Sequence, residues 1–162
     1  MKKLILLLLF IPLMSFGQSY KDVMSINSLD TFKKVAIENN YELDNIDYDD
    51  WVYYGHNITR DSINGNKSRK WMYYSKTDDK FGLQFSRIGQ DLFGNKDYNI
   101  DTSDNEYDLI VADIKEKCKY YKIINHKGVD FVSYSCSESS YKGKIGFAIS
   151  EGNGIIRHFP PE

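Results

Sequence analysis

Residues 50–54 read Asp-Trp-Val-Tyr-Tyr, and residues 130–134, 80 positions later, read Asp-Phe-Val-Ser-Tyr. These two segments are similar, and a second similar pair is Trp-Met-Tyr-Tyr-Ser at 71–75 and Gly-Phe-Ala-Ile-Ser at 146–150. Aromatic and β-branched residues favour strands, so each of these four segments is a predicted strand. In both copies a turn then leads into a third predicted strand, at 81–87 and 155–159.

A helix is predicted ahead of each set of strands. The first begins at Ser28, a favourable N-cap residue, and carries Asp30 in its first turn. It ends at Asn39-Asn40. The second is predicted to begin with a capping box formed by Ser103 and Glu106. Its apolar residues recur at helical spacing and are Tyr107, Ile110, Val111, Ile114 and Cys118.

This order predicts an α+β fold made of two αβββ units, with an antiparallel sheet and the helices packed on one face. We expect a single globular domain at residues 18–162, whose halves span about 25–88 and 103–160 and are joined by a linker at 89–102. Asn64-Gly65 is typical of a tight turn, which favours a hairpin between the first two strands. Internal duplication is a hypothesis, since two α+β halves can look alike by chance.

Residues 1–17 have the pattern of a cleaved export signal. Lys2 and Lys3 form a basic start, an apolar run follows from Leu4 to Met14, and the segment closes with Ser15-Phe16-Gly17. The apolar run is too short for a membrane-spanning helix, which needs about 20 residues. We therefore expect a mature chain that begins at Gln18, is secreted or periplasmic, and has no transmembrane anchor.

Charge excludes some classes of partner. Without the two lysines of the export signal, the 21 basic and 23 acidic residues leave a net charge of −4. Nucleic-acid binding needs a basic face that displaces counterions, so a nucleic-acid partner is not expected. The same argument disfavours anionic membrane surfaces. The unusual feature of the composition is aromatic, with 13 Tyr, 9 Phe and 2 Trp.

Cys118 and Cys136 are the two cysteines of the chain. In an oxidising compartment an isolated pair favours a disulfide over a catalytic thiol. Because side chains alternate along a strand, Cys136 shares a strand face with Val132 and Tyr134. A bond to Cys118 of the second helix therefore predicts that the helix covers this face. Two free buried thiols are the alternative, and they leave the face unassigned.

The same orientation in the first half leaves an aromatic group on the opposite sheet face. Its members, the predicted partner-binding residues, are Trp51, Tyr53, Trp71 and Tyr73. Exposed aromatic patches are typical of interaction sites, where Trp and Tyr supply much of the binding energy. The alternatives are burial within the protomer and a contact between two copies. A register slip of one residue exchanges the two faces.

A helix-and-sheet module repeated in tandem, with an aromatic open face, is similar in architecture to the secreted beta-lactamase inhibitor protein fold. In that fold the open sheet surface binds a partner enzyme, so the resemblance implies a protein partner for this face. It covers most of the mature chain in topology. No sequence motif or inhibitory loop accompanies it.

Catalytic and metal sites are not indicated. His56, His126 and His158 fall in none of the spacings typical of metal sites. We expect His56 to point inward, His126 to lie in an exposed turn, and His158 to lie on the sheet. The acidic residues between positions 44 and 50 lack the order of a calcium loop, which favours a solvated loop. We predict no catalytic residue, no metal and no cofactor.

These observations predict a non-enzymatic protein-binding module, acting as an inhibitor or as an envelope-associated factor. Two alternatives stay open. One is a carbohydrate-binding module, since aromatic faces stack on sugar rings. The other is a small secreted hydrolase, which needs His56 or His158 beside an acid. The sequence indicates neither the identity of the partner nor the oligomeric state.

Overall fold

The computed structural model describes residues 18–44, 50–60, 62–63, 65–86, 89–90, 96–97 and 105–161. The expected export signal at 1–17 lies outside these residues, and so does most of the predicted linker at 89–102. No helix within the described ranges has the length and apolar character that crossing a membrane requires.

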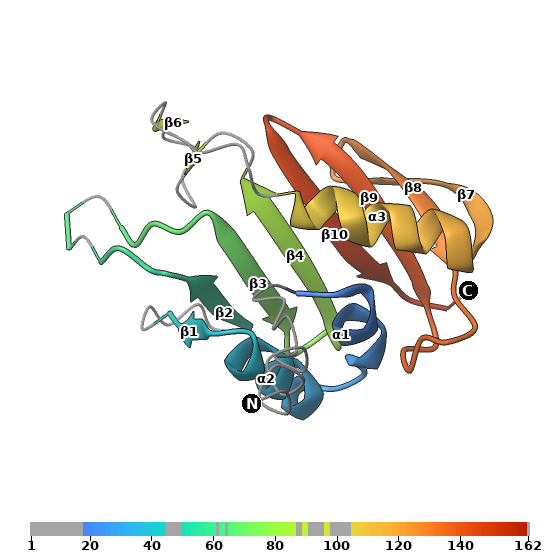
Figure 1. The fold of residues 1–162 in the computed structure, drawn as a ribbon, viewed down its shortest axis with the longest axis horizontal. Helices are drawn as coiled ribbons and strands as arrows, with labels where there is room; N and C mark the ends of the chain where they lie inside the picture. The colour runs from blue at the N-terminus through green and yellow to red at the C-terminus, as the bar shows by residue number, and fades with distance from the viewer. Residues whose placement is uncertain are drawn as a thin grey trace, which may run out of the picture.

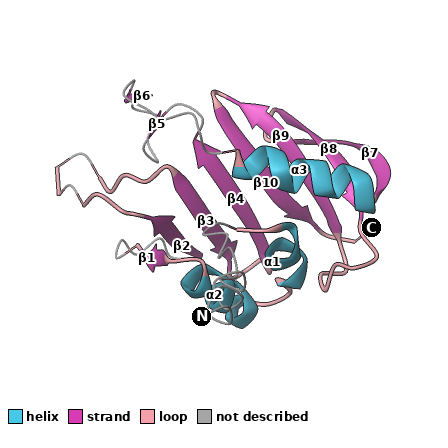
Figure 2. Ribbon diagram, viewed as in Figure 1, coloured by secondary structure: helices cyan, strands magenta, loops and turns pink. Residues whose placement is uncertain are grey.

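Helices and strands follow one another as a mixed α/β domain (Figures 1 and 2). The first half contains α1 (Tyr20–Ser25), α2 (Leu29–Glu38), β1 (Tyr41–Leu43), β2 (Trp51–His56), β3 (Lys70–Ser75) and β4 (Lys80–Ser86). The short strands β5 (Gly89–Gln90) and β6 (Lys96–Asp97) pair with each other. The second half contains α3 (Glu106–Lys117), β7 (Lys119–His126), β8 (Val129–Ser135), β9 (Lys144–Ser150) and β10 (Asn153–Phe159).

An eight-stranded antiparallel sheet runs through both halves, in the order β1-β2-β3-β4-β10-β9-β8-β7. The last strands of the two halves, β4 and β10, pair at its centre, where Leu83 lies opposite Ile156. The two halves therefore share one continuous sheet. In Figure 1 the three helices lie on the side of this sheet that faces the viewer.

Most of the predicted elements are confirmed. All six expected strands are present, and α2 begins after Ser28, whose side chain accepts a hydrogen bond from the Thr31 backbone N–H. Gly65 has the positive φ of 82° expected in the β2–β3 hairpin, whereas Asn64 lies outside the described residues. The sequence reading missed α1, β1 and β7. Each half therefore has four strands in the sheet, one more than predicted.

The predicted start of the second helix is wrong. Asn105 is the N-cap of α3, so Glu106 is the first helical residue rather than the fourth position of a capping box with Ser103. The Glu106 carboxylate accepts hydrogen bonds from the backbone N–H of Gln18 and from Lys70 Nζ. Ser103 lies outside the described residues. Glu106 thus has two partners that are far from it in sequence.

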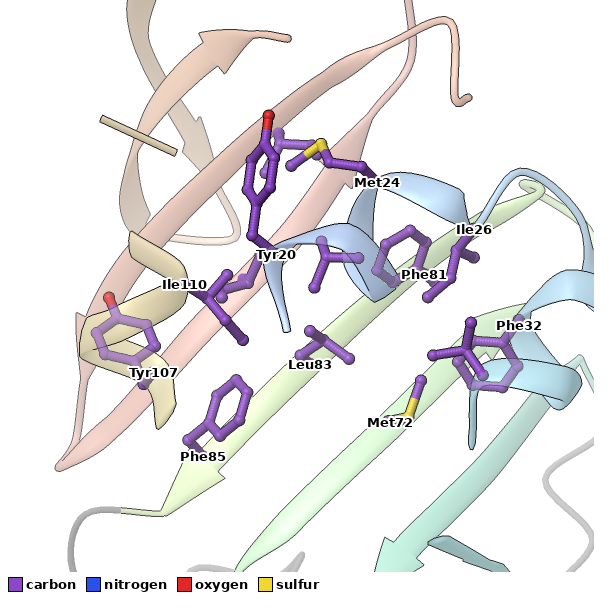
Figure 3. Packing of buried hydrophobic residues seen from close by; sticks show 14 of the residues in the cluster. Tyr20, Met24, Ile26, Phe32, Met72, Phe81, Leu83, Phe85, Tyr107 and Ile110 are labelled. Atoms are coloured by element: carbon purple, nitrogen blue, oxygen red, sulfur yellow. The ribbon is translucent and has the colours of Figure 1, made fainter. Parts of the chain in front are cut away.

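The main core lies between the helices and the sheet (Figure 3). Phe32 of α2 places its ring 5.9 Å from that of Tyr54 and 5.2 Å from that of Tyr74. At the other end, Tyr107 of α3 lies 5.9 Å from the ring of Phe85, between ring centroids. Aromatic pairs at these separations stabilise a core beyond the area they bury.

The predicted disulfide is present between Cys118 and Cys136, with Cα atoms 4.5 Å apart. Cys118 is the C-cap of α3, and Cys136 directly follows β8. Both cysteines pack against the main core together with Val132 and Tyr134. The bond thus joins the end of a helix to the strand face that was expected to lie beneath it.

Candidate functional site

Three of the four predicted partner-binding residues form one cluster. The ring centroids of Trp51 and Tyr53 are 6.3 Å apart, those of Trp51 and Tyr73 are 5.8 Å apart, and those of Tyr53 and Tyr73 are 6.1 Å apart. All three side chains are half-buried. We name Trp51, Tyr53 and Tyr73 the aromatic cluster.

Strand register places this cluster on the face opposite the main core. Tyr54 and Met72 belong to the core, and their strand neighbours Tyr53 and Tyr73 point the other way because side chains alternate. Tyr53 and Tyr73 lie directly opposite each other on β2 and β3. We name the face that carries the aromatic cluster the distal face. The predicted register holds without a slip.

Gly82 makes room for the Tyr73 ring. The two residues are opposite each other on β4 and β3. A Cβ atom at position 82 would lie 2.2 Å from Tyr73 Cζ, far inside van der Waals contact. Tyr73 therefore lies across the backbone of β4, and only glycine at this position permits that placement.

Arg157 of β10 is the next residue across the sheet after Tyr73 and Gly82. It lies opposite Gly82 on one side and opposite Gly146 on the other, so neither neighbouring strand presents a side chain beside it. Its positive charge lowers the pKa of the Tyr73 phenol, which burial raises. Arg157 is half-buried and forms no ion pair with a carboxylate of the described residues. The distal face thus carries a cation that no described acid neutralises.

Burial sets the protonation of the groups around Arg157. It raises the pKa of Tyr73 and of Tyr53, while the charge of Arg157 opposes the rise at both. Burial also lowers the pKa of His126, and the charge of Arg157 lowers it further. At neutral pH both phenols and the imidazole are therefore uncharged. Arg157 supplies the positive charge among them.

Trp71 does not lie open on the distal face as expected. Its side chain is only 2% exposed. It packs against Gly55, where a Cβ atom would lie 2.9 Å from Trp71 Cζ3 and 2.7 Å from Ile58 Cγ1. Trp71 therefore cannot touch a partner directly. Trp71 lies beside the aromatic cluster and supports it by packing.

A second apolar group occupies the distal face in the other half. Phe131, Ala148 and Phe159 are buried together, apart from the main core. Gly146 has the role there that Gly82 has beside Tyr73, since a Cβ atom at 146 would lie 2.7 Å from the ring of Phe159. Arg157 lies in the sheet between this group and the aromatic cluster.

The three histidines are on separate parts of the structure. His158 is fully buried on the core face, with its ring 3.6 Å from that of Phe81 and 4.0 Å from that of Tyr141, between centroids. Neither of its ring nitrogens has a hydrogen-bond partner among the described residues. His56 contacts the ring of Tyr41. His126, expected to be exposed, is half-buried beside Phe159.

No set of three or more His, Cys, Asp or Glu side chains in the described ranges is arranged to hold a metal ion. The acidic segment considered as a calcium loop falls largely at 45–49, outside the described residues. Asp44, at its start, is buried and accepts a hydrogen bond from Asn66 Nδ2 at 2.7 Å.

Sequence reasoning missed Arg157 and the burial of Trp71. Alternation along β10 puts Arg157 on a face with Ile155 and Phe159, but the pairing of β4 with β10 joins two distant halves and leaves no local signal. The burial of Trp71 did have a local signal in the sequence. An isolated glycine within a strand indicates a close approach, and Gly55 and Gly82 are both of this kind.

Comparisons with protein-family models, with curated proteins and with solved structures found no match to this chain.

Proposed function

We propose that this protein is an exported, non-enzymatic module that binds another protein through the distal face. The contact surface consists of Trp51, Tyr53, Tyr73 and Arg157, with Trp71 as a support behind it. Tryptophan, tyrosine and arginine are the residues that most often dominate binding energy at protein interfaces. The single observation that carries the proposal is the half-buried Arg157, which lies beside the aromatic cluster across Gly82 and is unpaired with any described acid.

The chemistry of this surface indicates the kind of group it binds. A guanidinium offers several N–H donors in a fixed plane and matches a carboxylate. The surrounding rings partly exclude water, which strengthens such a pair. We infer that the partner presents an Asp or Glu side chain, or a chain end, to Arg157. An inhibitor of an enzyme and an envelope-associated factor both fit this description.

The cellular location belongs to the same proposal. The disulfide between Cys118 and Cys136 suits an oxidising compartment, where such bonds form and persist. Together with the export signal expected at 1–17, it favours a secreted or periplasmic protein.

The test is capture of partners from the envelope and medium of the native organism. The bait is the mature chain, beside the variants Trp51→Ala and Arg157→Gln. Matched controls are Tyr120→Ala, which removes a 54% exposed ring at the sheet edge, and Lys142→Gln, which removes an exposed cation. A protein lost from the first two baits and kept by the controls supports the proposal. Equal recovery from all four contradicts it.

A carbohydrate partner is the second candidate, because flat rings and a guanidinium also suit a sugar that carries a carboxylate. Binding of acidic glycans by the pure mature chain, abolished by Trp51→Ala, favours this candidate. Saturable protein binding that survives enzymatic removal of glycans favours the first.

We also propose that the two halves arose by duplication, with helices on one face of the shared sheet. In each half a helix leads into four strands, and the strand orders β1-β2-β3-β4 and β7-β8-β9-β10 mirror each other about the central β4–β10 pair. The similar segments at 50–54 and 130–134 fall on the equivalent strands β2 and β8. Halves that superpose strand for strand support this proposal, and halves that fail to superpose contradict it.

A further inference from the structure

Gln18 occupies an unusual position for a residue at the expected start of a mature chain. It is only 3% exposed in the uncut chain, in which residues 1–17 precede it. Its backbone nitrogen donates to Glu106 Oε1, and its side-chain Nε2 lies 3.4 Å from Met72 Sδ as a donor. Chain ends are ordinarily at the surface and poorly ordered. Here the backbone nitrogen at position 18 is a buried hydrogen-bond donor.

The acceptor is itself buried and already carries one cation. The Glu106 side chain is 9% exposed, and its second oxygen accepts from Lys70 Nζ. A carboxylate removed from water is costly unless charged donors surround it. Each of its two oxygens therefore accepts from a donor that is distant in sequence, at 88 and 36 positions.

We propose that the chain is cut between Gly17 and Gln18 and that the freed α-amino group of Gln18 is a structural cation, held by Glu106 inside the fold. In the cut, water adds across the peptide bond, giving a carboxylate on Gly17 and a protonated amine on Gln18. The hydrolysis is the work of a signal peptidase of the export machinery. The proposal is independent of the binding function assigned to the distal face.

A protonated amine at this nitrogen adds donors and a charge that a peptide N–H lacks. It has three hydrogens where the peptide has one. Oε1 of Gln18 is a buried acceptor with no hydrogen-bond partner among the described residues. The residues that follow fix the position of the nitrogen, because Tyr20, Val23 and Met24 of α1 are buried in the main core. Cutting at this bond places a positive charge beside Glu106, which then has a cation at each of its oxygens.

The first measurement is the mass and N-terminal sequence of the chain exported by its native host. The proposal requires a start at Gln18 with a free amine. A start elsewhere contradicts it. A mass lower by one ammonia also contradicts it, because it shows that the Gln18 amine has closed onto its own side chain as a neutral lactam.

The second measurement is the unfolding equilibrium of the mature chain, with and without an acetyl group on Gln18. Acetylation removes the charge and keeps one N–H, and breaking a buried ion pair should raise the unfolding equilibrium constant roughly tenfold or more. In Glu106→Gln the effect of acetylation should shrink. In the control Glu38→Gln, an exposed acid on α2, it should persist. An acetylated chain as stable as the free one contradicts the proposal.

A third measurement needs no variant, in case Glu106→Gln does not fold. An α-amine ordinarily reacts with acylating reagents before lysine does, since its pKa is lower. In the folded mature chain, a buried and paired Gln18 amine should react more slowly than the exposed amine of Lys142. Faster reaction at Gln18 contradicts the proposal.

Discussion

Arg157 and Tyr73 lie on either side of Gly82, which is opposite each of them in the intervening strand β4. This arrangement brings the two halves of the chain together on the distal face, since Tyr73 is in β3 of the first half and Arg157 is in β10 of the second. The candidate binding surface therefore exists only when β4 and β10 are paired. The placement of Tyr73 beside Arg157 depends on residue 82 being a glycine, which has no side chain to occupy that space.

Gly82→Ala should displace the Tyr73 ring, because the added Cβ atom falls on it. Overpacking of this kind typically costs about 1–3 kcal/mol in the free energy of unfolding. Urea denaturation of the variant measures the loss. In a Tyr73→Ala background the same change should cost clearly less, because the clashing ring is gone. Equal costs in the two backgrounds contradict the contact.

Trp51→Ala and Trp71→Ala should separate binding from stability. Trp71 is buried, and truncating a buried Trp costs about 3–5 kcal/mol in the free energy of unfolding. Trp51 is half-buried, so Trp51→Ala should lower the free energy of unfolding much less, but it should abolish partner binding. Denaturation curves and capture yields of both variants check this. A Trp51→Ala chain as unstable as Trp71→Ala shows that Trp51 is a core residue.

His158 should make the fold sensitive to acid. Burial lowers its pKa well below 6.5, so the folded chain holds it neutral while the unfolded chain takes up a proton. The stability due to this difference is complete above the unfolded pKa and is lost as the pH falls below about 6.5. His158→Phe should flatten the decline of unfolding free energy between neutral and acidic pH. His126→Gln, at a half-buried histidine, should change it less.

Buried tyrosines should weaken the fold in alkali. Burial raises the pKa of Tyr73 and Tyr74 above 10.0, and at Tyr74 a hydrogen bond to Asp79 adds to the rise. A raised folded pKa gives stability that is complete below the unfolded value and is lost as the pH rises above it. The unfolding free energy should therefore decline above about pH 10. Tyr74→Phe should reduce that decline, and an unchanged pH profile contradicts it.

Removal of the disulfide should lower stability without changing the fold. Cys118 and Cys136 close a loop of 18 residues, which the chain-entropy model values at about 3 kcal/mol. Urea denaturation of Cys118→Ala/Cys136→Ala against the oxidised chain measures the difference. Two thiols that alkylate without prior reduction show that the exported chain lacks the bond.

Elements with strong local signals could be predicted from the sequence. The six strands of aromatic and β-branched residues, the N-cap at Ser28 and the Cys118–Cys136 pair all follow from short-range chemistry. Weak signals were missed: β1 has three residues, and β7 is an edge strand with a register shift between Tyr120 and Ile123. In α1 a signal was present, because Ser19 and Asp22 form a capping box.

The composition of the distal face could be predicted only in part. Trp51, Tyr53 and Tyr73 follow from alternation and from the face assigned by the disulfide. Arg157 depends on the pairing of two strands from different halves, which no local pattern encodes. The burial of Trp71 depends on Gly55 and on Ile58, which follows the strand. Contacts between distant segments decide which aromatic residues stay accessible.

Site-specific photo-crosslinking in the native envelope tests the distal face most directly. A benzophenone-bearing amino acid replaces Tyr53 in one chain and Tyr120 in another, and covalent adducts are compared after illumination. We expect one protein adduct from position 53 that disappears when Arg157→Gln is added, and none of that size from position 120. An adduct from position 120 alone, or one from position 53 that is indifferent to Arg157→Gln, contradicts this expectation.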